Sequence, residues 1–143
     1  MRALVVALSL TLLPAAALVQ TDVASVCTAD CEAKTHSNPE YKACLARAAD
    51  KADGLLNQGY QELQAAIRSD AKDMGQSPDT QLGDLKEAQK QWIAYRDANC
   101  TFEDSLAFGG TAIGGNYSAC LCALSYGRAS DFARIKKHVL GGE

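Results

Sequence analysis

Cysteines are the residues of this chain that could most readily do chemistry. There are six of them among 143 residues: Cys27, Cys31, Cys44, Cys100, Cys120 and Cys122. A thiol can attack a substrate, bind a metal ion or form a disulfide bond. The spacing of the cysteines in the sequence and the redox state of the protein's compartment favour one of these roles. Cys120 and Cys122 have one residue between them, whereas redox sites generally have two. Disulfide bonding is therefore the favoured interpretation.

Other residues that could support catalysis are few. The chain has two histidines, His36 and His138, and neither forms a recognisable arrangement with a nucleophile. A zinc site could be drawn from Cys27, Cys31, His36 and Cys44, but their spacing matches no standard zinc finger. We therefore predict that the protein is not an enzyme, and we predict no catalytic residue, no metal ion and no cofactor.

The first residues predict export from the cytoplasm. Met1-Arg2 gives a short positive start, residues 3–13 form an apolar run, and Ala15-Ala16-Ala17 is a small-residue cleavage site. We assign residues 1–17 to a signal peptide and expect a periplasmic or secreted protein. Because the first cysteine, Cys27, lies well downstream of the apolar run, we expect neither a lipid anchor nor another stable membrane anchor.

The rest of the chain predicts one all-α domain. We assign residues 18–36 to a cysteine-containing lead-in and residues 37–143 to the domain. Apolar residues recur every three or four positions in three stretches, which predicts helices over residues 39–69, 79–106 and 117–139. Gly75 and Pro78 interrupt the pattern once, and the glycines between residues 109 and 115 interrupt it again.

Short connections favour an antiparallel up-down-up arrangement of the three helices. This arrangement gathers all six cysteines at one pole of the molecule. We favour a Cys100–Cys120 disulfide, which would close the base of the glycine-rich loop. Cys122 faces another side of its helix, and its partner is left open among Cys27, Cys31 and Cys44.

Three charged residues interrupt the apolar faces of these helices: Asp53, Arg96 and Arg128. Counting about 1.5 Å of helix rise per residue from the cysteine pole places them at one level. They could form a binding pocket for an anion or a sugar. We favour a buried ion network in which Asp53 binds both arginines and fixes the register of the helices.

Several sequence motifs resemble those of one bacterial family. They are Cys44-Leu45, Ala52-Asp53-x-Leu55-Leu56-Asn57-x-x-Tyr60-x-x-Leu63, Leu85-x-x-Ala88-Gln89-x-x-Trp92-x-x-Tyr95-Arg96-Asp97-x-x-Cys100, Gly109-Gly110-Thr111, Cys120 and Arg128. Together they resemble the LprI-type lysozyme inhibitor family of exported proteins over residues 44–135. Two features depart from the family pattern: this chain lacks a lipidation cysteine, and Cys27, Cys31 and Cys122 add further bridges.

The resemblance implies an exported inhibitor that binds a lysozyme directly and occludes its cleft. The net charge of −3 is compatible with a basic protein partner and argues against nucleic acid or an anionic membrane. The glycine-rich segment lacks the sequence of a phosphate-binding loop. It could be a plain connection between two helices or a contact loop, and we assign the contact to Gly109, Gly110, Thr111 and Asn116. The alternative is a non-catalytic envelope adaptor that binds another protein or a cell-wall fragment.

Overall fold

A computed structural model describes residues 23–138 and 140–141 of the chain. Within these ranges there are four helices and no strand: α1 (Val23–Lys34), α2 (Asn38–Asp73), α3 (Asp79–Ser105) and α4 (Gly115–His138). The all-α class is confirmed. The predicted signal peptide at residues 1–17, the first residues of the lead-in and Val139 lie outside the described residues.

The second helix is the longest, and local sequence signals set both of its ends. Ser37 is in an extended conformation and its side-chain oxygen accepts a hydrogen bond from the backbone N–H of Glu40, which is a standard N-cap. At the other end Gly75 has a positive φ of 67°, and the N–H of Gln76 donates to the carbonyl of Ala71 at 2.8 Å. This Schellman motif turns the chain towards α3.

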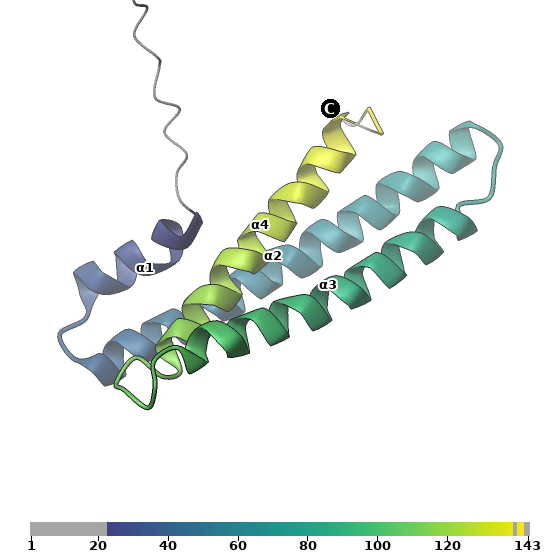
Figure 1. Cartoon of the computed structure of the whole chain (residues 1–143). Helices are drawn as coiled ribbons and strands as arrows, with labels where there is room; N and C mark the ends of the chain where they lie inside the picture. Colours follow the sequence, from purple (N-terminus) through teal and green to yellow (C-terminus); the bar gives the residue numbers. More distant parts are fainter. Residues whose placement is uncertain (1–22, 139, 142–143) are drawn as a thin grey trace, which may run out of the picture.

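The helices pack around the apolar face of α2. Its buried residues are spaced by three, four, seven or eight positions: Leu45, Ala49, Ala52, Leu56, Leu63 and Ala71. Most interhelical packing joins α2 to α4, and α3 packs mainly against α4 (Figure 1). Near the cysteines the core consists of small residues and half-cystines, whereas Leu56, Leu63 and Phe132 form a second cluster farther along.

The first helix corrects the predicted three-helix architecture. We treated residues 18–36 as a lead-in, but residues 23–34 form α1, which contacts α2 and α4. This segment has no regular apolar stripe, and its helical signal is the spacing of Cys27 and Cys31. Residues four apart share one helical face, so both half-cystines point into the molecule, where they are 2% and 1% exposed.

Three disulfides join the helices at the end of the molecule where α2 and α4 begin and α3 ends. They are Cys27–Cys122, Cys31–Cys44 and Cys100–Cys120. The first links α1 to α4, the second links α1 to α2, and the third closes the connection between α3 and α4. We call this end of the molecule the disulfide pole.

The disulfides should contribute unequally to stability because they close loops of different length. Cys27–Cys122 spans 95 residues and Cys31–Cys44 spans 13. In the chain-entropy picture, replacing the first pair with alanine should lower the free energy of unfolding by about 1.5 kcal/mol more than replacing the second. Urea denaturation of the two double variants measures this difference. Equal losses would show that packing, and not loop closure, dominates.

Candidate functional site

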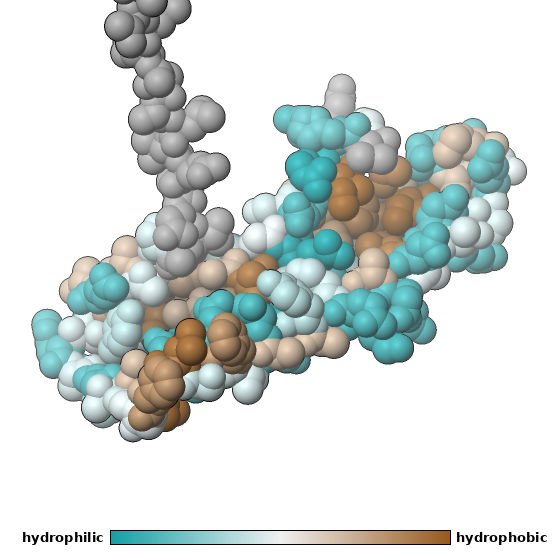
Figure 2. All heavy atoms as spheres, viewed as in Figure 1, coloured by the Kyte–Doolittle hydropathy of each residue, from teal (hydrophilic) through white to brown (hydrophobic). Residues whose placement is uncertain are grey.

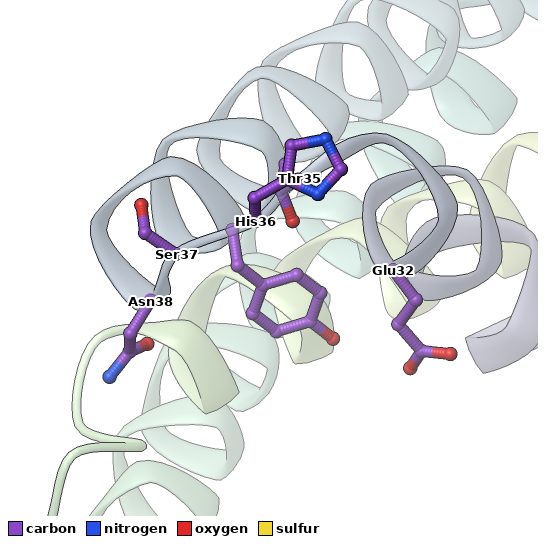
Figure 3. A pocket seen from close by; sticks show the side chains of 6 residues that line it. Glu32, Thr35, His36, Ser37 and Asn38 are labelled. Carbon is purple, nitrogen blue, oxygen red and sulfur yellow. The ribbon is translucent and has the colours of Figure 1, made fainter.

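A wide hollow opens at the disulfide pole where α1 meets α2. It has a volume of about 500 Å³ and is lined by Glu32, Thr35, His36, Ser37, Asn38 and Tyr41. Figure 3 shows that Glu32 projects from α1 while Asn38 lies at the start of α2. Burial raises the pKa of Tyr41, and the nearby negative charge of Glu32 raises it further. This hollow is open to solvent and polar.

Two more hollows continue the first one across the pole. Asn38 and Tyr41 also line a cavity of about 160 Å³ against Ala112 and Gly115. Asn116 and Ala119 line both this cavity and a groove of about 370 Å³ between the end of α3 and the start of α4. The shared residues make the three hollows one continuous surface.

Large apolar side chains project from the same pole. They are Phe102, Leu106, Phe108 and Ile113, with exposed fractions of 60%, 52%, 90% and 43%. We call these four residues the apolar knob. Figure 2 shows the corresponding apolar patch over the connection between α3 and α4. Contiguous exposed apolar residues on a soluble protein commonly mark a contact with another protein.

The contact residues predicted from the sequence lie beside the knob. Gly109, Gly110, Thr111 and Asn116 are all exposed. The Thr111 carbonyl accepts a hydrogen bond of 3.0 Å from Asn38 Nδ2, which ties the loop to α2. Sequence reasoning missed Phe108. The sequence did contain a signal for its exposure: a large aromatic residue directly before two glycines, where no helix could bury it.

Several interactions hold the loop in one conformation. Asp104 Oδ1 accepts hydrogen bonds from the N–H groups of Gly114 at 2.7 Å and Tyr117 at 3.1 Å. Phe108 has a φ of 47° and Gly109 a φ of 82°, so two successive residues are left-handed. This conformation is uncommon for a phenylalanine and has to be held by the surrounding structure. Here Asp104, Asn38 and the Cys100–Cys120 disulfide hold it.

The charge of this part of the chain has one sign. Between residues 97 and 127 the charged residues are Asp97, Glu103 and Asp104, and there is no lysine, arginine or histidine. The apolar knob and the groove beside it therefore belong to an acidic stretch of sequence.

The expected ion network exists only in part. Arg96 donates from Nη1 to Asp53 Oδ1 at 2.9 Å and to Ser125 Oγ at 3.2 Å, and from Nε to Asp97 Oδ1 at 2.9 Å. Its side chain is 13% exposed. Burial alone lowers the pKa of Arg96. The hydrogen bonds that Arg96 donates to Asp53 and Asp97, together with their negative charges, outweigh burial and raise that pKa above its ordinary value.

The prediction that Arg128 also binds Asp53 is wrong. Arg128 Nε donates to Gln89 Oε1 at 3.2 Å, and its guanidinium lies 4.7 Å from the ring centre of Phe132 and 5.8 Å from that of Trp92. Burial lowers the pKa of Arg128, and the charge of Asp131 offsets this only partly. Gln89 lies almost two helical turns before Arg96 on α3, so Arg128 contacts that helix at a different level from the one at which Arg96 binds Asp53.

The predictions about metal-binding and catalytic residues concern the histidines and the cysteines. Among residues 23–138 and 140–141, no three His, Cys, Asp or Glu side chains are grouped so as to hold a metal ion. Each cysteine is in a disulfide, and His36 and His138 are exposed. None of the described helices has an apolar stretch long enough to cross a membrane.

Comparison with known proteins shows what this chain is similar to. The model of the LprI lysozyme inhibitor family matches residues 28–132. The chain is a member of the LprI lysozyme inhibitor family. It is also similar to an uncharacterized protein of Rhizobium meliloti (strain 1021), with 31% identity over 109 residues that cover 74% of this chain and 78% of the relative. None of the solved structures matches this LprI-family protein.

The family match spans the disulfide pole and the ion pair but ends before the last turns of α4. It includes five of the six cysteines, and the sixth, Cys27, lies one residue before the match. It also includes Asp53, Arg96 and the whole connection between α3 and α4. The features that hold the knob in place are therefore within the part of the chain that the family model matches.

The first prediction from this site concerns the buried arginine. Replacing Asp53 with alanine should lower the free energy of unfolding by about 1 to 2 kcal/mol, because Arg96 loses one charged partner but keeps Asp97. Urea denaturation measures the change. Asp50→Ala is the matched control, since Asp50 is an exposed carboxylate on the same helix. Equal stability of both variants would contradict a stabilising Asp53–Arg96 pair.

The second prediction concerns the loop. Replacing Asp104 with alanine removes the acceptor of two backbone N–H groups. The amide hydrogens of Gly114 and Tyr117 should then exchange with solvent at least about tenfold faster, which corresponds to about 1.4 kcal/mol of lost protection. Hydrogen exchange followed by NMR measures this rate. Asp84→Ala, an exposed carboxylate on the same helix, should leave both rates unchanged. Unchanged rates in Asp104→Ala would mean that Asn38 and the Cys100–Cys120 disulfide are sufficient to order the loop.

Proposed function

We propose that this LprI-family protein is an exported inhibitor that binds a lysozyme directly and occludes its substrate cleft. The observation that carries the proposal is the apolar knob, with Phe108 projecting from a loop held on both sides. The family match supports lysozyme as the partner. The exported location is supported by the three disulfides, because such bonds form and persist in oxidising compartments.

The shape of the knob suits a concave partner. Phe108 is 90% exposed in the free protein, so nearly its whole ring is available to be buried on binding. Aromatic side chains that fill a pocket at the centre of an interface commonly contribute most of its binding energy. An enzyme cleft is such a pocket, and a rigid loop that enters it excludes the polysaccharide substrate.

The rigidity of the loop also favours tight binding. Ordering a flexible loop on association has an entropic cost that subtracts from affinity. In this protein Asp104, Asn38 and the Cys100–Cys120 disulfide have already ordered it. We infer that the predicted contacts at Gly109, Gly110, Thr111 and Asn116 flank Phe108, and that the glycines let the partner approach the backbone closely.

Electrostatics favours the same partner. The knob lies in a stretch, residues 97–127, that holds three acidic residues and no basic one. Complementary charge increases the rate at which a protein meets an oppositely charged partner and depends on salt concentration. A cationic lysozyme would be attracted to this acidic stretch, although Lys42 of α2 lines the adjoining cavity.

The proposal can be tested by measuring how fast a lysozyme lowers the turbidity of a cell-wall suspension. The oxidised protein should slow this reaction for at least one of three enzymes: a chicken-type, a goose-type or an invertebrate-type lysozyme. Phe108→Ala should weaken the inhibition by about 10- to 30-fold, as expected for a central aromatic anchor. Met74→Ala truncates another exposed apolar side chain, 58% exposed, at the far end of α2 from the disulfide pole, and this variant should inhibit normally.

Two outcomes would contradict this function. Correctly folded, oxidised protein that inhibits none of the three enzymes at micromolar concentration would favour the alternative, an envelope adaptor that binds another protein or a cell-wall fragment. Inhibition that Phe108→Ala leaves intact would show that the enzyme is bound elsewhere on the molecule.

A further inference from the structure

The groove beside the apolar knob has the form of a site for one side chain. It lies between the end of α3 and the start of α4, has a volume of about 370 Å³, and is lined by Glu103, Leu106, Asn116, Ala119, Cys120 and Ala123. Ala119 and Ala123 are one helical turn apart, so the space above them is left open by their small size. The volume is at the lower end of the range for small-ligand pockets, roughly 300–1,000 Å³.

One carboxylate stands at this groove without a cation. Glu103 Oε1 accepts a hydrogen bond of 2.7 Å from Asn99 Nδ2, which orients the carboxylate from one helical turn away. No ion pair of the described residues includes Glu103. The other acidic residues of this stretch are engaged, since Asp97 binds Arg96 and Asp104 binds the backbone of the loop.

The combination of an apolar wall and a terminal carboxylate fits an amphipathic cation. Lysine and arginine have a long apolar stem and a charged head, and they bury the stem while the head stays paired. In this groove the stem would lie against Leu106 and Ala119, and the head would reach Glu103. A guanidinium can donate two parallel hydrogen bonds to a carboxylate, which makes arginine the better fit.

We propose that this groove receives an arginine or lysine side chain of the inhibited lysozyme, with Glu103 as its charge partner. The inference rests on the proposed function and adds a specificity-determining contact to it. Leu106 belongs to both the knob and the groove, so a partner seated on Phe108 also covers the groove. Lysozymes with a basic residue at the rim of the cleft are therefore bound, and those without one are bound more weakly.

The experiment compares two variants of the groove with two matched controls. Glu103→Gln removes the charge and keeps the shape, and Ala123→Leu fills the groove. Glu87→Gln makes the same charge change on α3, and Ala133→Leu the same enlargement on α4, both at exposed positions away from the groove. Circular dichroism and disulfide mapping confirm that each variant is folded. Titration calorimetry then gives the dissociation constant for the inhibited lysozyme at low and high salt.

The expected result is a loss of affinity confined to the groove variants. Glu103→Gln should raise the dissociation constant about tenfold and flatten its dependence on salt, as the loss of one buried charge pair predicts. Ala123→Leu should weaken binding by a similar factor, whereas both controls should stay within about twofold of the parent. If Glu103→Gln and Ala123→Leu bind like the parent while Phe108→Ala does not, the groove proposal is wrong and the inhibitor function stands.

A second arm tests the groove without any lysozyme. N-acetyl-arginine amide at millimolar concentration should shift the NMR signals of Leu106, Ala119 and Ala123 in the parent protein. The shifts should be absent in Glu103→Gln and absent with the uncharged N-acetyl-norleucine amide. If the parent binds no lysozyme but shows these shifts, the proposed function fails and the groove is still a site for a basic side chain. Absent shifts in the parent overturn the groove proposal.

Discussion

The structure depends on the disulfides that link the four described helices at one end of the molecule. Few large side chains are fully buried, and apart from Phe132, Leu45, Leu56 and Leu63 the largest of them are half-cystines. Four of the six half-cystines are exposed by 2% or less, so the disulfides occupy the position that larger apolar residues hold in other helical domains. A small domain with a limited core generally needs such cross-links to remain folded. The helices are therefore held most firmly at the disulfide pole.

The third helix shows how polar contacts supplement this linkage. It packs mainly against α4 and makes little contact with α2. Arg96 joins it to both neighbours, since the guanidinium binds Asp53 of α2 and Ser125 of α4. Trp92 lies 5.5 Å from the guanidinium carbon of Arg96 and 5.8 Å from that of Arg128. This ion pair is only partly buried, since the side chain of Asp53 is 49% exposed, so it adds modest stability while it specifies one arrangement of the helices.

The sequence predicted the features that follow from helical periodicity, and it failed where the partner of one side chain or local exposure mattered. The apolar faces through Leu45, Leu56 and Leu63 were predictable because they repeat with the helical period. Helix α1 was missed because its only inward signal is a pair of cysteines four residues apart. Periodicity placed Arg128 on the stripe of its helix but did not give its partner, Gln89 of α3. The exposure of Phe108 depends on a loop conformation that no periodic pattern encodes.

The glycines of this loop allow a sharp turn, and they do not serve to make the loop flexible. Phe108 and Gly109 are both left-handed, so the chain reverses sharply and the phenylalanine side chain points into solvent. A glycine at the second of these positions has no steric penalty there, while Asp104 and the Cys100–Cys120 disulfide fix the ends of the loop. The most exposed aromatic ring of the described residues is thus mounted on the most heavily cross-linked part of the molecule. Burying an exposed apolar ring is favourable in water, so a partner that covers the ring gains binding free energy. Because the loop is already ordered, less of this gain is lost to the entropy of ordering it on binding.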